Sequence, residues 1–362
     1  MAIKRIFSLI IACAVILFGG YSVYQSIELG DVPVSFFDIP QWANRAISRQ
    51  FSKSERLGQI APVLMLSVGA QEQDGIFITK NALFENIAEP KVEILSKNLK
   101  GLEEFLSDRS TPSAIALIPT ACAIKQQELP SSVKLFNQKA LIADCYEKLS
   151  GKASTIDAYS RLFAAKNQYT YYRTEPQLTG LGGYYVYTAI TSRLGITPRP
   201  LDQFEVENLE EDFYGSLYSR SGFKGVSPDL ITLYRFSRFS RQYKLSVTQN
   251  GEQKSYYTLF PTHLSALGEP KSVIFGGLGE RMDISVASPY EDSLLIFADN
   301  SVLSYLPFLV VHYGNITYID LSKCTEEQLS QIKIDDYNQI LFSYSVDNFM
   351  HKDICSAAAL IK

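Results

Sequence analysis

The sequence lacks several features that would indicate particular classes of protein. It has no basic stripe, and its net charge of −4 argues against binding to a phosphate backbone, so no nucleic-acid partner is predicted. No two cysteines form a Cys-x-x-Cys pair and no ligand pair has zinc spacing, so neither a metal nor another cofactor is predicted. Hydrophobic residues make up 46% and charged residues 20% of the chain, which is typical of a folded body.

The five cysteines leave the redox state open. Cys13 lies in an apolar N-terminal run, and the other four, Cys122, Cys145, Cys324 and Cys355, are scattered along the chain. Outside the cytoplasm they could form one or two disulfides, with Cys324–Cys355 as a candidate pair from position alone. Buried free thiols are the alternative.

The N-terminus predicts the compartment. Lys4 and Arg5 precede an uncharged stretch, Ile6–Ile27, whose strongly apolar part has about the length that a helix needs to cross a bilayer. The positive-inside bias then places residues 1–27 as a cytoplasmic tip and transmembrane signal-anchor, with the body extracytoplasmic, in the cell envelope. A cleaved signal peptide and a lipoprotein anchored at Cys13 are the alternatives.

The rest of the chain divides into a stem and a body. Residues 28–58 begin with turn residues and continue as WANRAISRQFSKSER (42–56), either an amphipathic helix at the lipid surface or a helix packed on the body. Residues 59–362 form the predicted domain. Its apolar runs, Ile60–Val68, Ala114–Ile118, Leu294–Ala298 and Leu306–His312, are too short to span a membrane, and several are bounded by turn residues, as buried strands are.

Helical patterns separate the apolar runs. They cover roughly Gln138–Leu149, Thr155–Ala165 and Thr179–Arg193. Strands that alternate with helices predict an α/β architecture with a largely parallel sheet.

Six segments of the body resemble, in order, sequence blocks of the DHHW family of SGNH-like acyl-transfer proteins. They are DGIFITKNALFE (74–85), ALIPTACAIKQQELP (116–130), YYRTEPQLTGLGGYYVY (171–187), FYGSLYSRSG (213–222), VIFGGLGERMDI (273–284) and LLIFADNSVLSYLPFLVVHYGNITYIDL (294–321). The resemblance implies an SGNH-like three-layer α/β fold. It also implies a likeness to proteins that O-acetylate exported polysaccharides beside a membrane-bound O-acyltransferase.

The residues that this chemistry needs are replaced. In the family a serine nucleophile follows an Asp, which corresponds here to Asp299, so Asn300 occupies the nucleophile position. An amide cannot attack an ester, and Ser301, one residue later, is a weak alternative nucleophile. Because a shift of one residue at a strand-to-helix turn re-aims the side chain, we do not expect Ser301 to take over the role.

The other family positions are also degenerate. Where the family has Asp-His-His-Trp, this chain has Glu175-Pro176-Gln177-Leu178, which keeps a carboxylate and loses both histidines. The family's Gly-Gly-Asn is matched by Gly276-Gly277-Leu278, without the amide that could help to hold an oxyanion. The remaining histidines, His263, His312 and His351, complete no triad by sequence pattern.

These losses predict a retained fold without the chemistry. We expect no catalytic residue and a pseudoenzyme that binds a cell-surface glycan, or that scaffolds or regulates a membrane-bound O-acyltransferase. One alternative is an active polysaccharide O-acetyltransferase or acetylesterase with a rearranged site, built from Ser301 or Ser304 with His263 or His312. The other is a purely structural envelope protein. We expect Arg173, Thr174, Leu181, Gly182, Asp299, Pro307, Phe308 and Leu309 to serve the scaffold, and most of the tyrosines at 171–187 to pack in the core.

Overall fold

The computed structural model describes residues 19–21, 23–25, 27–28, 30 and 72–361, apart from 108, 132, 237–241, 268–269 and 288–289. The chain forms two units: Met1–Asp74 with Tyr218–Gly225, and Gly75–Leu217 with Val226–Lys362. The predicted anchor over residues 6–27, the stem over 28–58 and the run 60–68 lie outside the described residues, apart from the few named above. Within the described part of the chain, no helix has the length and apolarity needed to cross a membrane.

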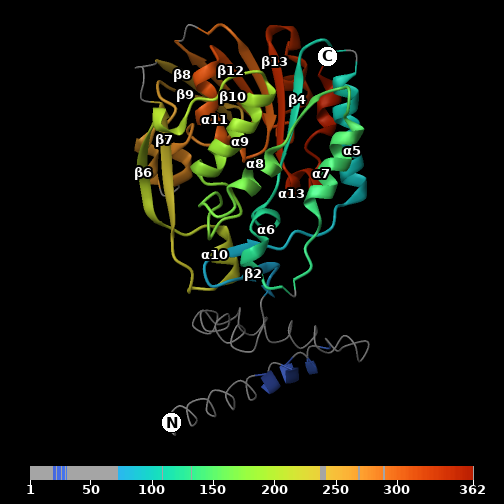
Figure 1. The fold of residues 1–362 in the computed structure, drawn as a ribbon, viewed down its shortest axis with the longest axis vertical. Helices are drawn as coiled ribbons and strands as arrows, with labels where there is room; N and C mark the ends of the chain where they lie inside the picture. Colours follow the sequence, from blue (N-terminus) through green and yellow to red (C-terminus); the bar gives the residue numbers. More distant parts are fainter. Residues whose placement is uncertain are drawn as a thin grey trace. The chain divides into compact units, whose positions relative to one another are not determined.

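A mixed sheet of eight strands organises the larger unit (Figure 1). Its order is β5 (Ser154–Ile156), β4 (Ser113–Ile118), β13 (Gln339–Ser345), β11 (Ser293–Ala298), β12 (Asn315–Ile319), β10 (Arg281–Val286), β8 (Tyr243–Gln249) and β9 (Glu252–Tyr256). The strands from β5 to β12 pair in parallel, and β10, β8 and β9 add antiparallel pairs at one edge. The predicted α/β fold with a largely parallel sheet is therefore confirmed.

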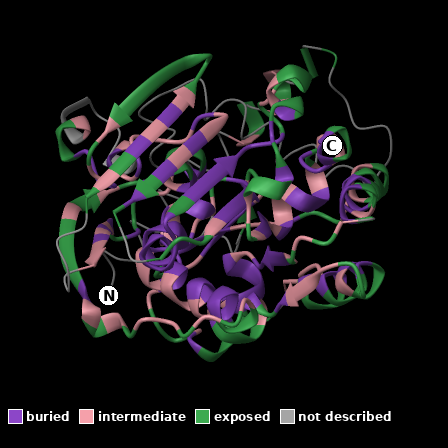
Figure 2. Cartoon of the chain, turned by 90° about the horizontal axis from the view of Figure 1, so that it is seen from above, coloured by how far each residue is buried: buried purple, intermediate pink, exposed green. Residues whose placement is uncertain are grey.

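Alternation along the central strands supplies two hydrophobic cores. In β4, Ala114 and Ala116 belong to one cluster, whereas Ile115 and Leu117 belong to the other. Successive strand residues point to opposite faces, so a strand that is apolar at every position must be covered on both sides. Figure 2 shows the result, with buried residues concentrated on the central strands and exposed residues on the outer sides of the helices.

Helices cover both faces of the sheet. The core on one face contains residues of α6 (Ala121–Ile124), α8 (Ala158–Ala164), α9 (Gly180–Arg193) and α11 (Val302–Leu309). The core on the other face contains residues of α5 (Val92–Leu106), α7 (Gln138–Lys148), α12 (Glu326–Ser330) and α13 (Val346–His351). Full burial of a large apolar side chain contributes about 1.5–3 kcal/mol, so both clusters stabilise the layers.

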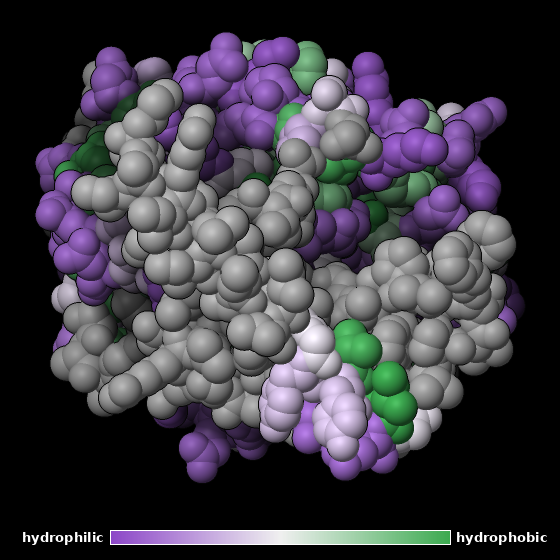
Figure 3. All heavy atoms as spheres, turned by 90° about the horizontal axis from the view of Figure 1, so that it is seen from below, coloured by the Kyte–Doolittle hydropathy of each residue, from purple (hydrophilic) through white to green (hydrophobic). Residues whose placement is uncertain are grey.

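Shorter elements complete the described chain. β2 (Ile76–Ile78) and β3 (Leu83–Glu85) form an antiparallel hairpin, and β6 (Phe204–Phe213) pairs with β7 (Asp229–Phe236) as a separate ribbon. The remaining helices and strand are α10 (Ser216–Ser221), β1 (Glu72–Gln73) and the 3₁₀ turns η2 (Gln126–Glu128), η3 (Leu201–Gln203), η4 (Thr262–Leu267), η5 (Pro270–Val273), η6 (Val310–His312), η7 (Ile334–Asp336) and η8 (Ser356–Leu360). The described residues visible in Figure 3 are mainly hydrophilic around the rim, with small hydrophobic areas between them.

The apolar run Leu306–His312 forms the end of α11 and η6, because helical packing buries such a run as well as a sheet does. One helix boundary needs correction. The helix expected over Thr155–Ala165 begins only at Ala158, after the short strand β5, where the side chain of Asp157 caps it by accepting a hydrogen bond from the Ser160 N–H.

The proposed Cys324–Cys355 disulfide is absent, and the four described cysteines are free thiols. Cys355 is fully buried beside α5, where a Cβ on Gly101 would lie 2.4 Å from the Cys355 carbonyl oxygen. Cys324 is half-buried, and its Sγ lies 3.6 Å from the Glu280 carbonyl oxygen. The alternative of free thiols describes the molecule.

Candidate functional site

Three turns meet at the carboxyl ends of the parallel strands. Pro119-Thr120 follows β4, Asp299-Asn300-Ser301 follows β11, and Ser345 ends β13 and caps α13. In open α/β sheets the crevice outside these strand ends is where ligands bind. Neighbouring strands therefore bring together residues that are far apart in the sequence.

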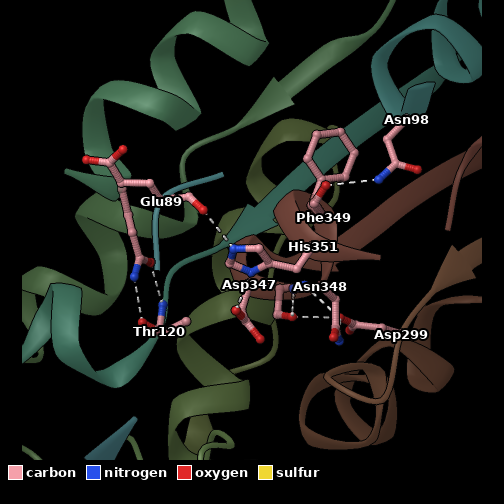
Figure 4. A network of polar contacts seen from close by, with 10 residues as sticks. Glu89, Asn98, Thr120, Asp299, Asp347, Asn348, Phe349 and His351 are labelled. Atoms are coloured by element: carbon pink, nitrogen blue, oxygen red, sulfur yellow. Dashed lines mark hydrogen bonds and ion pairs between the residues drawn. The ribbon is translucent and has the colours of Figure 1, made fainter. Parts of the chain in front are cut away.

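Asp299 joins two of these turns (Figure 4). Its Oδ2 accepts hydrogen bonds from the Ser345 N–H at 2.9 Å, the Ser345 hydroxyl at 2.8 Å and Asn348 Nδ2 at 2.7 Å. Its Oδ1 accepts from the Ser301 N–H at 3.0 Å. Four donors satisfy a nearly buried carboxylate, so Asp299 fixes the turn after β11 against the start of α13.

A cavity of about 390 Å³ opens at this place. The turns after β4, β11 and β13 line it together with the β3 end and the segment 176–178. Its lining residues are Leu83, Glu85, Ile87, Ile118, Pro119, Thr120, Ala121, Cys122, Tyr171, Pro176, Gln177, Leu178, Leu217, Asn300, Ser301, Ser345, Asp347, Asn348 and Lys352. Polar side chains from several elements converge here, which is typical of a binding site.

A second, smaller cavity of about 30 Å³ shares four lining residues with the first. The shared residues are Gln177, Leu178, Asn300 and Ser301. The rest of its lining includes aromatic side chains from β7 and α11, among them Tyr234 and Phe308. A chamber of mixed polar and apolar lining and a small, largely apolar one thus meet at Asn300, the residue predicted to occupy the nucleophile position.

A buried carboxylate holds the segment that carries the degenerate motif. Asp229, at the start of β7, accepts hydrogen bonds from the Arg173 N–H at 2.7 Å and the Thr174 N–H at 2.8 Å. The hydroxyls of Tyr169 and Thr174 also donate to it. Burial, followed by the hydrogen bond to Asp229, raises the pKa of Tyr169. Arg173 and Thr174 therefore have the expected scaffold role.

The predicted site residues are only partly brought together. Gln177, Asn300 and Ser301 line both cavities. Glu175 points elsewhere: its Oε2 accepts a 2.6 Å hydrogen bond from the Ser216 N–H at the start of α10. Leu278 is half-buried against the core and lines neither cavity. The carboxylate that the motif retains thus supports a loop.

The two serines near Asn300 have different surroundings. Ser301 Oγ is buried and has no hydrogen-bond partner among the described residues. The Ser304 hydroxyl donates a 2.7 Å hydrogen bond to the Ser301 carbonyl oxygen. Among the contacts of the described chain, neither serine has an imidazole base in hydrogen-bond reach.

The histidines lie away from this serine, and none lines either cavity within the described part of the chain. His312 is buried, with Nε2 2.7 Å from the Tyr187 hydroxyl, which also accepts from the Arg199 N–H. His263 is exposed beside the Tyr256 ring. Neither ring is placed to activate Ser301 through a contact of the described residues.

Sequence reasoning missed the Asp347–His351 pair. On α13, His351 Nδ1 lies 2.8 Å from Asp347 Oδ1, and Nε2 lies 3.0 Å from the Glu89 carbonyl oxygen (Figure 4). Asp347 lines the larger cavity. The signal was an Asp and a His four residues apart at a strand end, a spacing that places both on one face of a helix.

The thiol in the larger cavity is not poised as a nucleophile. Burial raises the pKa of Cys122 to about 12. Its Sγ–H donates to the Glu85 carbonyl oxygen at 2.6 Å. Within the described residues there is also no group of three His, Cys, Asp or Glu side chains that could hold a metal.

The family is decided by comparison with known proteins. The family model described as "DHHW protein" matches residues 86–319. The chain belongs to the DHHW family. No curated protein matches it.

Two solved structures have a similar fold, and a third is more distantly similar. A DHHW family protein from Eubacterium siraeum DSM 15702 is 19% identical, with a TM-score of 0.66 over 80% of this chain and 95% of its own. Bacillus cereus PatB1 with a sulfonyl adduct is 14% identical, with a TM-score of 0.65 over 79% and 98%. The O-acetyltransferase domain of Pseudomonas putida AlgJ is 12% identical, with a TM-score of 0.49 over 79% and 98%.

Proposed function

We propose that this DHHW-family chain is a membrane-anchored, extracytoplasmic pseudoenzyme that binds a cell-surface polysaccharide. It would act as a scaffold or regulator of polysaccharide modification, beside a membrane-bound O-acyltransferase. The observation that carries the proposal is that Asn300 and Gln177 both line the two cavities where these meet. An amide stands where a nucleophile is needed and another where a base is needed.

The shape of the site supports binding over a purely structural role. A filled core around Asn300 would have left no room for a ligand. Instead Asn300 is exposed and lines a cavity of about 390 Å³. Ligand pockets commonly span roughly 300–1,000 Å³ and combine an apolar wall with a few polar groups, as this one does.

One observation favours an active enzyme as the second candidate. Ser301 Oγ is buried, unpartnered and lines both cavities, as a displaced nucleophile would. Its activation would need an imidazole from His263 or His312, and the hydrogen bond of His312 to Tyr187 commits that ring elsewhere. We therefore favour the pseudoenzyme.

Turnover and binding separate the two candidates. The full chain, purified in a detergent without a sugar headgroup, would be assayed with 4-nitrophenyl acetate and with partially O-acetylated cellohexaose. Asn300→Ser and Ser301→Ala variants would run beside it. We expect no hydrolysis by the wild type, and calorimetric binding of the oligosaccharide. Wild-type turnover that Ser301→Ala abolishes would overturn the pseudoenzyme proposal.

The anchor and the compartment have a separate test. Residues 6–27 are the proposed membrane segment, and the body after them is proposed to face the cell envelope. We expect the chain in the membrane fraction, with the body open to protease added outside intact cells. Release of the full-length chain from membranes by high salt alone would contradict a spanning anchor.

A further inference from the structure

Asp347 has one carboxylate oxygen fixed and the other available. Oδ1 is held by the 2.8 Å contact with His351 Nδ1, and no described residue makes a hydrogen bond to Oδ2. Asp347 lines the larger cavity, and its side chain is 34% exposed, so Oδ2 can reach a ligand without losing its contact with the ring. A partly exposed carboxylate oxygen at a cavity wall is a strong acceptor for a donor group.

The contacts of His351 require a particular protonation state of its ring. Both ring nitrogens face atoms that can only accept: Asp347 Oδ1 and the Glu89 carbonyl oxygen. Each nitrogen must therefore supply a proton, so the ring that makes both contacts is the imidazolium. The same ring ties the connection between β3 and α5 to α13, and this connection includes Ile87 of the cavity wall.

The groups beside Asp347 specify the chemistry of a ligand. Asn300 is exposed and offers an amide that can both donate and accept. A carboxylate acceptor and an amide around one chamber match neighbouring hydroxyls of a neutral sugar, each of which both donates and accepts. The carboxylate disfavours an anionic group at its own position.

We propose that Asp347 anchors sugar hydroxyls in the larger cavity and that His351 is the residue that positions it. This inference rests on the proposed function and adds a residue and a condition to it. When the ring loses a proton, a neutral imidazole can keep only one of its two contacts. Either Asp347 or the Glu89 tether is then released. Sugar binding is therefore stronger when the ring carries both protons than when it carries one.

The elements around the pair also carry other charged groups, of which Glu85 and Lys352 line the same cavity. β4 and β13, which pack against α13, carry no charged residue. The charged residues on α13, on α5, at the β3 and β11 ends and in the adjoining connections are Asp347, Lys352, Asp353, Glu85, Glu89, Lys91, Glu93, Lys97, Lys100, Glu103, Glu104 and Asp299. Asp299 is satisfied by its own donors, and Lys100 pairs with Glu104. Within the described part of the chain, the His351 ring makes its polar contacts with Asp347 and Glu89.

The test compares matched variants over pH. Binding of cellohexaose, plain and partially O-acetylated, to the full chain would be measured by calorimetry at several pH values. We expect Asp347→Asn to bind at least about tenfold more weakly, since a hydrogen bond to a charged group is lost. His351→Gln should bind more weakly at low pH and lose the pH dependence. Asp144→Asn and His263→Gln, both at exposed positions, should behave as the wild type does.

Ligand-free spectra and melting curves make the outcomes distinct. Nitrogen-15 spectra of His351 should show a proton on both ring nitrogens. In Asp347→Asn, one of the two nitrogens should lose its proton. Thermal melts would identify variants that fail to fold. Wild-type binding that Asp347→Asn leaves unchanged overturns this inference and leaves the proposed function standing. No binding of either oligosaccharide by the wild type overturns the proposed function, and the ligand role of Asp347 with it. A pH profile of His351→Gln equal to that of the wild type overturns the positioning role.

Discussion

Asn348, on the first turn of α13, donates a 2.7 Å hydrogen bond to Asp299, the residue that directly follows β11. The two residues follow neighbouring parallel strands, β13 and β11, and Asp299 also accepts hydrogen bonds from Ser345 and Ser301. Asp299 therefore holds together two walls of the cavity, whatever the chemistry at Asn300.

Asp299→Asn should destabilise the fold. An Asn at this position presents an amide N–H₂ where the carboxylate accepts from several donors, so at least one buried donor loses its acceptor. We expect the free energy of unfolding to fall by about 1.5–3 kcal/mol, the range for hydrogen bonds to charged groups. Urea denaturation would measure it, with Asp144→Asn as an exposed control that should stay within about 0.5 kcal/mol of wild type. Equal effects of the two variants would show that the network contributes no net stability.

The double variant Gln177→His, Asn300→Ser should gain weak esterase activity. Both positions line both cavities, so a base and a nucleophile introduced there face a common space. A positioned general base contributes about 10²–10⁴-fold, so the double variant should hydrolyse 4-nitrophenyl acetate faster than Asn300→Ser alone. Glu175 accepts a hydrogen bond from the Ser216 N–H, so it does not orient the new histidine. Without an orienting carboxylate, the activity should remain low.

The control for this gain is Gln177→His with Asn300→Ala, which adds the base without a nucleophile. It should show no increase over the wild type. If Asn300→Ser alone is as fast as the double variant, another group activates the serine and the assignment of Gln177 to the base position is wrong.

Much of the fold was predictable because it depends on local patterns of hydrophobic and capping residues in the sequence. The runs at 114–118 and 294–298 are apolar at every position, and a strand of that kind has to lie between two helical layers, as β4 and β11 do. The helix at 179–193 starts where expected, since Thr179 accepts a hydrogen bond from the Gly182 N–H as its cap. By contrast, the apolar run at 306–312 fits a strand or a buried helix, and only packing decides between them.

The site was less predictable because it depends on long-range contacts. Asn300 and Gln177 could be placed together through their family blocks. Leu278 was grouped with them by the same argument, yet it packs against the core. The contact between His351 and Glu89 joins residues 262 positions apart, which no local pattern reveals. What Asp347 contributes to the cavity therefore became visible only in three dimensions.

Gly183→Ala should weaken the packing between α9 and α11. A Cβ at Gly183 would lie 1.9 Å from the Ser304 carbonyl oxygen, a backbone atom that cannot move aside cheaply. Overpacking of this kind costs about 1–3 kcal/mol, and we expect a lower melting temperature by calorimetry. Ser192→Ala, an exposed change on the same helix, is the matched control and should melt close to wild type. Unchanged stability of Gly183→Ala would mean that the helices can separate without cost.

Cys122 should react slowly with iodoacetamide although it lines a cavity. Burial holds its pKa at about 12, above that of an ordinary thiol, so the neutral form prevails and the reactive thiolate appears only as the pH approaches that value. At pH 8 the thiolate fraction should be roughly a thousandfold below that of a free cysteine with a pKa near 8.5. Peptide mapping by mass spectrometry should show the rate rising about tenfold per pH unit up to pH 10. Cys324, whose pKa burial raises only to about 11, should be labelled sooner. Rapid labelling of Cys122 at pH 8 in the folded protein would mean that the cavity exposes the thiolate. It would also mean that the hydrogen bond from the thiol to the Glu85 carbonyl oxygen does not persist in solution.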